Sequence, residues 1–314
     1  MAKGTADTSL VKQAHQKMVY TPQQAMELMK CKDPVTGPEY FLRHFFYIIH
    51  PKRGEILFKP FDYQLDLINN YHNFRFSINM LGRQMGKTTV AAGYIVWKAM
   101  FEPNAQILIA AHKAEGASEI MARIRHCYEG VPDHIRCGVT EWNKTSITFD
   151  NGSVIQCSTT NKTTGRGKSL SLIYIDEFAF VPENIAPEFW VSLAATLSEG
   201  GDCIITSTPN SDEDTFANIF RSAEQTIDPE TGRERPGGIG INGYKAYKAV
   251  WNQHPNRGPG TIQPNFEQEQ RSAMGDEKFD REHNCLAQDA KVRIKFPNGE
   301  VKEVTMEELE EILR

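Results

Sequence analysis

The sequence predicts an α/β fold in which a parallel sheet carries helices on both faces. From residue 74 onward, short apolar segments alternate with longer segments of helical periodicity, which is typical of a parallel sheet. A glycine-rich turn follows the first apolar segment, and an acidic pair follows a later one. Both features favour ligand binding at the carboxyl edge of such a sheet.

The expected elements follow one another up to about residue 206. A strand at 76–81 leads into the glycine-rich turn and then into a helix from Thr88 to about Met100. The next expected elements are strand 106–111, helix 114–128, a hairpin closed by Asp150, Asn151 and Gly152, strand 172–175 and strand 203–206. The aromatic-rich segment 40–49 favours a buried helix, and the turn-rich segment 228–240 predicts an exposed loop.

The composition is that of a globular chain without membrane or export signals. Hydrophobic residues make up 40% and charged residues 24% of the 314 residues. No apolar run is long enough to span a membrane, and the N-terminus lacks the apolar stretch of a secretory signal, so we expect a cytoplasmic protein. A net charge of -5 and a pI near 6.0 do not indicate a strong nucleic-acid binder, so any DNA contact is expected to be local, transient or supplied by a partner.

The cysteines predict neither a disulfide framework nor a structural zinc site. All 6 are scattered without a C-x-x-C pair, and no histidine pair has zinc-ligand spacing. We expect ordinary reduced thiols at every position except Cys285.

A candidate phosphate-binding loop follows the first strand and reads Gly82-Arg83-Gln84-Met85-Gly86-Lys87-Thr88-Thr89. It supplies a glycine that lets the backbone approach, amides at a helix N-terminus, a lysine for the β- and γ-phosphates and a hydroxyl for magnesium. The general pattern has Gly about five residues before the second glycine, where this chain has Leu81. The first glycine is thus displaced by one position, and a chance Gly-Lys-Thr remains the alternative for this motif alone.

An acidic pair lies at the end of a later strand. Segment 172–175 runs directly into Asp176 and Glu177, which places two carboxylates at the edge of the sheet where ligands bind. We expect Asp176, with Thr88, to hold Mg²⁺, and Glu177 to polarise the water that attacks the γ-phosphate of ATP. A solvated acidic pair is the alternative, and the upstream phosphate loop makes it the weaker one.

Further polar side chains lie near these two motifs. The hydroxyls of Thr206, Ser207 and Thr208, at the end of the last strand, are candidates to sense the γ-phosphate, although hydroxyls are also ordinary at strand ends. Gln64 precedes the first strand, and an amide can pair with both the donor and the acceptor edge of adenine.

Four segments together resemble the large terminase subunit of T-even-like tailed phages. They match that family in order and spacing, and they are residues 81–89, 141–147 with 150–153, 173–182 and 206–210. The similarity extends over about residues 20 to 284 and is more specific than any single motif. The resemblance implies a P-loop ATPase of the additional-strand class that moves double-stranded DNA into a procapsid. It also implies a ring of identical subunits at the portal in the host cytoplasm, with the portal protein and the small terminase subunit as partners.

The resemblance also implies roles for individual residues. It assigns Gln64 to the adenine, and it accounts for the displaced glycine, because these terminases have Arg-Gln in the loop. Arg83 then stabilises charge on the transferred phosphoryl group, with a loop-shaping salt bridge as the alternative. Arg166 resembles another arginine-glycine element that contacts phosphate or DNA, with a flexible loop tip as the alternative. The expected catalytic residues are Glu177, Arg83 and Lys87, and the expected nucleotide-binding residues of the loop are Gly82, Gln84, Gly86, Lys87, Thr88 and Thr89.

The resemblance to terminases ends at Asn284. Family members continue into a nuclease domain, whereas the residues from Cys285 onward resemble the opening of an intein, with Ala290 in place of the usual threonine. Two strands around a Pro-Asn-Gly turn are expected next, followed by a helix with a capping box at Thr305. About 30 residues of this kind cannot close a core alone. We therefore expect the N-terminal fragment of a split intein, which docks on a separately made C-terminal intein and nuclease chain.

In this interpretation Cys285 is a nucleophile. Its thiol attacks the carbonyl carbon of Asn284 to give a thioester, which passes to the first residue of the partner. The assisting histidine and the cyclising asparagine come from the partner. An ordinary buried cysteine before a degraded C-terminus is the alternative.

The sequence thus predicts a helical subregion at 1–60, an ATPase domain at 61–284 and a split-intein fragment at 285–314. Two other functions stay open. A helicase-like P-loop translocase needs motifs in a second RecA-like domain, and a non-hydrolysing nucleotide-binding scaffold has no need of a carboxylate at Glu177.

Overall fold

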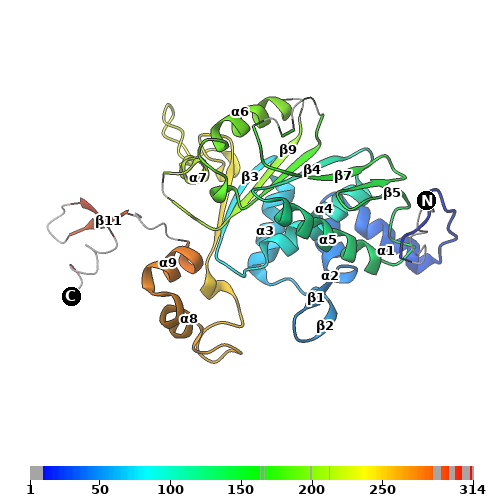
Figure 1. Ribbon diagram of the computed structural model, residues 1–314, viewed down its shortest axis with the longest axis horizontal. Helices are drawn as coiled ribbons and strands as arrows, with labels where there is room; N and C mark the ends of the chain where they lie inside the picture. Colours follow the sequence, from blue (N-terminus) through cyan, green and yellow to red (C-terminus); the bar gives the residue numbers. More distant parts are fainter. Residues whose placement is uncertain are drawn as a thin grey trace.

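The computed structural model describes residues 10–162, 164–165, 167, 169–198, 200–211, 213–285, 291–296, 301–305 and 312. An eight-stranded sheet with helices on both faces forms the body of the molecule (Figure 1). Its strands are β3 (Phe76–Leu81), β4 (Gln106–Ala111), β5 (Val139–Trp142), β6 (Ser146–Phe149), β7 (Val154–Thr159), β8 (Leu172–Asp176), β9 (Asp202–Ser207) and β10 (Lys245–Ala249). The helices are α1 (Pro22–Lys32), α2 (Gly37–His44), α3 (Asp62–Asn73), α4 (Lys87–Phe101), α5 (Ala114–Gly130), α6 (Ala186–Thr196), α7 (Thr215–Glu224), α8 (Phe266–Met274) and α9 (Asp276–Asn284).

The strand order of the large sheet is β10-β3-β9-β8-β4-β7-β6-β5. The strands from β10 to β7 run parallel, and β6 and β5 extend the sheet with antiparallel pairings. β9 lies between the strand that precedes the glycine-rich turn and the strand that precedes the acidic pair. This inserted strand is the feature after which the additional-strand class is named, so the predicted fold class is confirmed.

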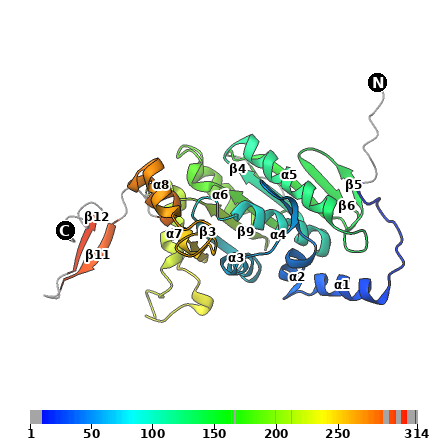
Figure 2. The same ribbon diagram turned by 90° about the horizontal axis from the view of Figure 1, so that it is seen from below.

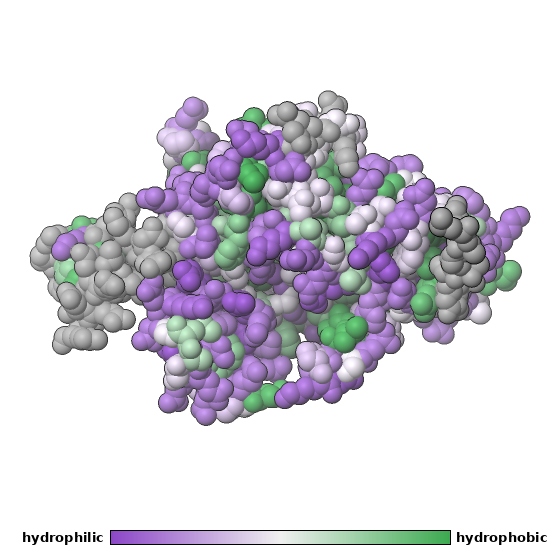
Figure 3. All heavy atoms as spheres, viewed as in Figure 1, coloured by the Kyte–Doolittle hydropathy of each residue, from purple (hydrophilic) through white to green (hydrophobic). Residues whose placement is uncertain are grey.

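The alternation of side chains along the central strands produces the two helical layers. In β4, Ile107 and Ile109 join the core cluster formed with α2 to α5, whereas Leu108 and Ala110 join the cluster formed with α6 and α7. Because both faces are covered, the central strands are apolar at nearly every position. The face shown in Figure 3 is largely hydrophilic, with hydrophobic residues in small separate groups. In the described part of the chain, no helix is long and apolar enough to cross a membrane.

The predicted strands and helices between residues 76 and 207 are confirmed and differ only at their ends. The buried helix predicted for 40–49 is wrong in its second half, because α2 ends at His44. Tyr47–His50 instead forms β1, which pairs with β2 (Gly54–Leu57) in an antiparallel hairpin. The aromatic and β-branched residues of this segment suit a strand. Segment 228–240 is mostly exposed and non-repetitive, as predicted.

The N-terminal and C-terminal segments differ in how they join this body. Within the predicted region 1–60, Phe41, Leu42 and Phe46 are buried in the same core cluster as α4. At the other end, β11 (Lys291–Lys295) and β12 (Val301–Thr305) form the expected antiparallel hairpin. Figure 2 shows this hairpin beyond α8, at the end of the molecule opposite α1. The predicted turn at 297–299 and the capping-box residues after Thr305 lie outside the described residues.

Candidate active site

The glycine-rich loop and the acidic pair meet at the carboxyl edge of the sheet. β3 and β8 are parallel, with only β9 between them, so both motifs emerge at the same edge. The Nζ atom of Lys87 lies 2.7 Å from Oε1 of Glu177. The hydroxyl of Thr88 donates to Oδ2 of Asp176 at 3.4 Å. The structure therefore brings together the four residues on which the predicted chemistry depends.

The loop after β3 has the backbone conformation of a phosphate cradle. Gln84 and Gly86 both have left-handed backbones, with φ of 59° and 78°. The carbonyl of Met85 accepts hydrogen bonds from the Tyr63 hydroxyl at 3.0 Å and from Nε2 of Gln64 at 3.2 Å. Helix α4 begins at Lys87, so the positive end of its dipole and its free amides lie at the loop. Left-handed residues at such a loop form concave nests of N–H groups that bind anions.

Asp176 is buried in a hydroxyl network at the end of β8. Its Oδ1 accepts hydrogen bonds from the Tyr174 hydroxyl at 2.8 Å and from the Thr206 hydroxyl at 2.9 Å. Burial raises the pKa of Asp176, and the charge of Glu177 adds to this effect, while Lys87 opposes it. The other oxygen, Oδ2, faces Thr88.

A hydroxyl beside a carboxylate suits Mg²⁺, which prefers hard oxygen ligands and usually completes its shell with substrate phosphates. No group of three or more His, Cys, Asp or Glu side chains in the described residues is arranged to hold a metal ion. The Thr88 hydroxyl and the Asp176 carboxylate, 3.4 Å apart, are oxygen ligands of the kind that the predicted magnesium ion prefers.

Glu177 leaves the strand in a strained conformation. Its φ and ψ are 52° and 47°, in the left-handed region that costs a non-glycine residue roughly 1–3 kcal/mol. Its Oε2 accepts hydrogen bonds from the Ser207 hydroxyl at 3.4 Å and from the Thr208 backbone N–H at 3.3 Å. The hydroxyls at the end of β9 thus hold the two carboxylates: Thr206 binds Asp176, and Ser207 and Thr208 bind Glu177.

Arg83 and Thr89 do not contact the acidic pair. The backbone N–H of Arg83 donates to the Glu282 carbonyl at 2.6 Å, and its Nη1 lies 3.5 Å from Oε2 of Glu282. The Arg83 side chain is 60% exposed, which leaves its guanidinium accessible. The Thr89 hydroxyl accepts a hydrogen bond from Nη1 of Arg123 at 3.4 Å.

Gln64 lies under the loop with both ends of its amide in use. Oε1 accepts from the Phe61 N–H at 3.1 Å, and Nε2 donates to Met85. These two hydrogen bonds use one donor and one lone pair of an amide that is 4% exposed, and its contact with an adenine stays a prediction.

Cys285 lies behind the phosphate loop, at the C-terminal end of α9. Its φ of 55° is left-handed, and its thiol points to the Ala249 carbonyl at a distance of 3.7 Å. Burial raises the pKa of Cys285 to about 12, against the opposing charges of Lys248 and Lys87. The adjoining residues 286–290 and the candidate Arg166 lie outside the described residues.

Three residues that the sequence did not single out contact the site. Tyr174 lies two residues before Asp176 on the same face of β8, so the period of a strand could have indicated it. Tyr63 and Arg257 reach the loop from distant parts of the chain, Arg257 by donating to the Gln84 carbonyl at 3.2 Å. No local sequence signal indicates these two contacts.

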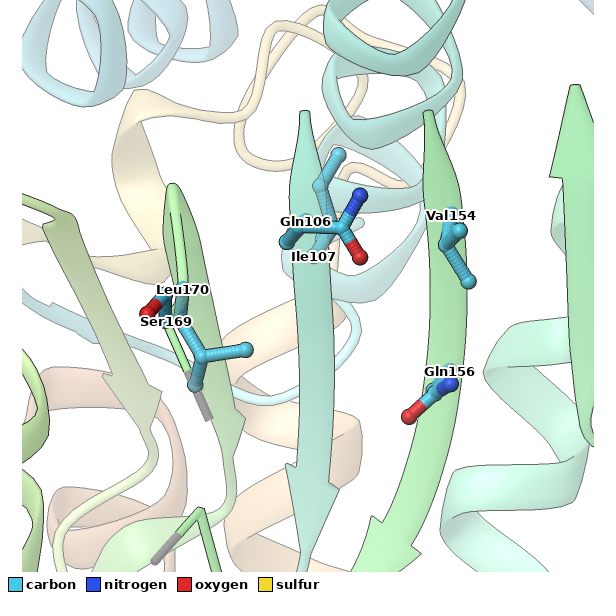
Figure 4. A pocket seen from close by; sticks show the side chains of 6 residues that line it. All are labelled: Gln106, Ile107, Val154, Gln156, Ser169 and Leu170. Carbon is cyan, nitrogen blue, oxygen red and sulfur yellow. The ribbon is translucent and has the colours of Figure 1, made fainter. Parts of the chain in front are cut away.

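A cavity of about 250 Å³ lies at the opposite end of the sheet. Figure 4 shows the six side chains that line it, at the amino ends of β4 and β7 and just before β8: Gln106, Ile107, Val154, Gln156, Ser169 and Leu170. The length of β4 separates this cavity from the phosphate loop, so it is a different place from the candidate active site.

Comparisons with known proteins agree with this fold. The fold is similar to the large terminase ATPase domain of Thermus phage P74-26, with a TM-score of 0.57 and 21% identity over 73% of this chain and 94% of that one. It is also similar to the large terminase of bacteriophage HK97, with a TM-score of 0.60 and 16% identity over 82% of this chain and 55% of that one. A large terminase of a thermophilic bacteriophage, in complex with ATP-γ-S, gives a TM-score of 0.51 and 13% identity over 72% of this chain and 53% of that one.

The family model described as terminase large subunit, T4likevirus-type, N-terminal, matches residues 78–294. This range includes the phosphate loop and the acidic pair, begins after Gln64 and ends within the segment after Cys285. Because the match covers more than half of the chain, the chain belongs to the T4-like family of terminase large subunits and contains their N-terminal domain.

Proposed function

We propose that this chain hydrolyses ATP and that hydrolysis drives double-stranded DNA into a viral procapsid. The observation that supports this most directly is the 2.7 Å contact between Lys87 and Glu177. It brings the cation for the phosphates and the base for the attacking water to one point at the sheet edge. The ATP-γ-S complex of a large terminase with this fold supports the choice of nucleotide.

Each side chain at this edge has a separate role in phosphoryl transfer. Lys87, at the start of α4, is placed to bind the β- and γ-phosphates, and in doing so it would release Oε1 of Glu177. Mg²⁺ held by Thr88 and Asp176 would neutralise charge on the phosphate oxygens. Ser207 and Thr208 hold Oε2 of Glu177, so the freed Oε1 can orient a water molecule and accept its proton. Arg83 is exposed at the loop and can swing from Glu282 toward the transferred group.

Two alternatives fit less well. A nucleotide-binding scaffold that does not hydrolyse gives no reason for a strained Glu177 held by three hydrogen bonds from Ser207 and Thr208. A helicase-like translocase is less favoured because the family model that matches residues 78–294 is that of a terminase large subunit.

The test is phosphate release by the purified chain in Mg-ATP. Glu177→Gln removes the base but keeps a hydrogen-bonding side chain, so we expect kcat to fall by roughly a hundredfold or more. Nucleotide binding should survive in this variant and should be lost in Lys87→Ala. Glu188→Gln is the matched control, because Glu188 is exposed and its ion pair in the described part of the chain is with Lys162. Hydrolysis at the wild-type rate in Glu177→Gln would remove the proposed base.

The assembly proposed for the motor follows from the family and from the charge. A net charge of -5 gives one copy little attraction for DNA phosphates. A ring of copies at the portal, with the portal protein and the small terminase subunit, could supply the contacts that one copy lacks. Sedimentation of the chain with and without portal and DNA tests this assembly.

We further propose that Asn284 and Cys285 form the junction of a split intein. Helix α9 ends at Asn284, and a β-hairpin, β11 with β12, follows Cys285 in the sequence. In the reaction, the Cys285 thiol adds to the Asn284 carbonyl carbon, and the C–N bond breaks. The freed amine takes a proton, which leaves a thioester for the partner's first residue to attack. Since burial raises the pKa of Cys285 to about 12, the C-terminal intein and nuclease chain must expose this thiol on docking.

Mixing the chain with a candidate C-terminal intein chain tests this second proposal. We expect a spliced product of higher mass and a released intein. Cys285→Ala should abolish both, whereas Cys157→Ala, which alters a cysteine on β7, should leave splicing intact. Splicing by the Cys285→Ala chain would refute the mechanism.

A further inference from the structure

One buried arginine contacts the phosphate loop from outside the candidate active site. Arg257 lies in the segment between β10 and α8 and is only 7% exposed. Its Nη2 donates to the Gln84 carbonyl at 3.2 Å, and its Nη1 lies 3.5 Å from Sδ of Met85. The guanidinium carbon is 4.2 Å from the centre of the Phe266 ring in α8. Arg257 therefore connects the C-terminal helices to the loop.

No carboxylate in the described part of the chain neutralises this guanidinium. Its Nε is buried and has no hydrogen-bond partner among the described residues. The nearby His254 and His283 cannot help, because burial and the charge of Arg257 lower the pKa of each to about 4 and leave them neutral at physiological pH. Holding an unpaired cation away from water is costly for a protein. Because Arg257 lies beside the loop, its buried positive charge can favour the binding of an anionic ligand there.

The contact with Gln84 explains the shape of the loop. Gln84 is a non-glycine residue with a left-handed backbone, which needs support from its surroundings. Arg257 binds the Gln84 carbonyl, while Tyr63 and Gln64 bind the next carbonyl, that of Met85. Two consecutive carbonyls are thus held by donors from other elements, which fixes the left-handed part of the loop in a shape that can form an anion-binding nest.

We propose that Arg257 is a positioning residue for the phosphate loop. It fixes the left-handed Gln84, and its unpaired charge strengthens the binding of the triphosphate. This inference rests on the proposed binding of ATP, and it adds a residue from outside the loop and the sheet edge. It also gives α8 a route by which its movement could alter nucleotide affinity, because Phe266 packs on the guanidinium.

Two substitutions separate the contribution of the hydrogen bond to Gln84 from that of the positive charge of Arg257. Arg257→Gln keeps a donor for the Gln84 carbonyl and removes the charge. Arg257→Lys keeps the charge and loses the planar fork. The measurements are the affinities for Mg-ATP and Mg-ADP as a function of salt, together with KM and kcat. Arg136→Gln is the matched control, since Arg136 is another buried arginine, donates to the carbonyls of Leu10 and Tyr128, and does not contact the loop.

We expect Arg257→Gln to weaken ATP binding by roughly tenfold because it removes a nearby positive charge, and to weaken ADP binding less because ADP carries less negative charge. Its ATP affinity should also depend less on salt, KM should rise more than kcat falls, and Arg257→Lys should recover part of the affinity. Arg136→Gln should lower the melting temperature and leave nucleotide affinity unchanged.

Three results would overturn the inference. They are unchanged ATP affinity in a folded Arg257→Gln chain, equal losses for ATP and ADP, or a loss of affinity in Arg136→Gln as large as in the Arg257 variants. If Arg257→Gln does not fold, Arg257→Lys decides by the same comparison of ATP with ADP. A wild-type chain that binds no Mg-ATP would instead remove the proposed function, and this inference with it.

Discussion

At the scale of single residues, the buried carboxylate of Asp176, the proposed magnesium ligand, destabilises the folded state. Burial and the charge of Glu177 raise its pKa above the value in the unfolded chain. Between the pKa of Asp176 in the unfolded chain and its higher pKa in the folded chain, the folded state binds more protons than the unfolded state. The free energy of unfolding therefore falls as the pH rises through this range. At neutral pH, where the unfolded chain is fully ionised, this destabilisation is present.

The first prediction follows from that sign. Asp176→Asn keeps an oxygen for the Tyr174 and Thr206 hydroxyls and removes the charge, so we expect the free energy of unfolding at pH 7 to rise by roughly 1 kcal/mol. Hydrolysis that depends on Mg²⁺ should be lost in the same variant. Urea unfolding at pH 7 and at pH 4.5 measures the change, and the gain should shrink at the lower pH. A variant less stable than wild type at pH 7 would contradict this reading of the site.

The second prediction concerns Tyr174, whose hydroxyl binds both Asp176 and Thr206 at 2.8 Å. Tyr174→Phe leaves these two buried groups with one donor fewer, so it should cost about 1–3 kcal/mol of unfolding free energy. Thermal or urea unfolding measures the loss. Tyr71→Phe is the control, because the Tyr71 hydroxyl is buried and has no partner in the part of the chain that the structure describes, so its removal should cost little. Equal losses in both variants would show that the network around Asp176 gives no special support.

At the scale of elements, the close approach of α9 to the phosphate loop depends on a glycine. A Cβ atom added to Gly82 would lie 2.8 Å from the His283 carbonyl, so Gly82→Ala must displace the end of α9. We expect a loss of about 1–3 kcal/mol in urea unfolding. Faster alkylation of Cys285, which follows α9 directly, should accompany the loss.

Gly116→Ala provides the contrast for this third prediction. Gly116 lies within α5, and its added Cβ would meet only the Ala111 side chain, at an ordinary 3.5 Å. Alanine is the better helix former by up to about 1 kcal/mol, so this variant should be as stable as wild type or more so. If both substitutions had the same effect on stability, the contact between α9 and the loop would not be the reason that residue 82 must be glycine.

The elements that the sequence predicts well are those with a local signal. Strand 76–81 and helix α4 follow from apolar periodicity and from the glycine-rich turn between them. The segment after His44 was misassigned because a short aromatic and apolar run suits a buried helix and a strand equally well. The Lys87–Glu177 pairing could be anticipated because parallel strands end at one edge of a sheet. The contacts of Arg257 and Glu282 with the loop could not, because they depend on how segments far apart in the chain pack together.

At the scale of the whole molecule, the proposed nucleotide site lies where several regions meet. The loop after β3 contacts α3 through Gln64, β8 through Asp176, α9 through Glu282, and the segment before α8 through Arg257. A ligand bound there would therefore stabilise contacts throughout the sheet and at the end of α9. Cooperative unfolding of the chain should respond to nucleotide as a unit, apart from the β11–β12 hairpin, which lies beyond α8 (Figure 2).

The fourth prediction tests this coupling. A ligand that binds only the folded state adds RT ln(1 + [L]/Kd) to stability, about 2.7 kcal/mol at a hundred times Kd. Mg-ATP-γ-S and Mg-ADP should therefore raise the melting temperature of the whole chain in a concentration-dependent way. Lys87→Ala should abolish the shift because it removes the cation at the phosphates. Lys162→Ala should keep it, because Lys162 is exposed and pairs with Glu188 of α6. A shift that survives in Lys87→Ala would place the nucleotide elsewhere on the molecule.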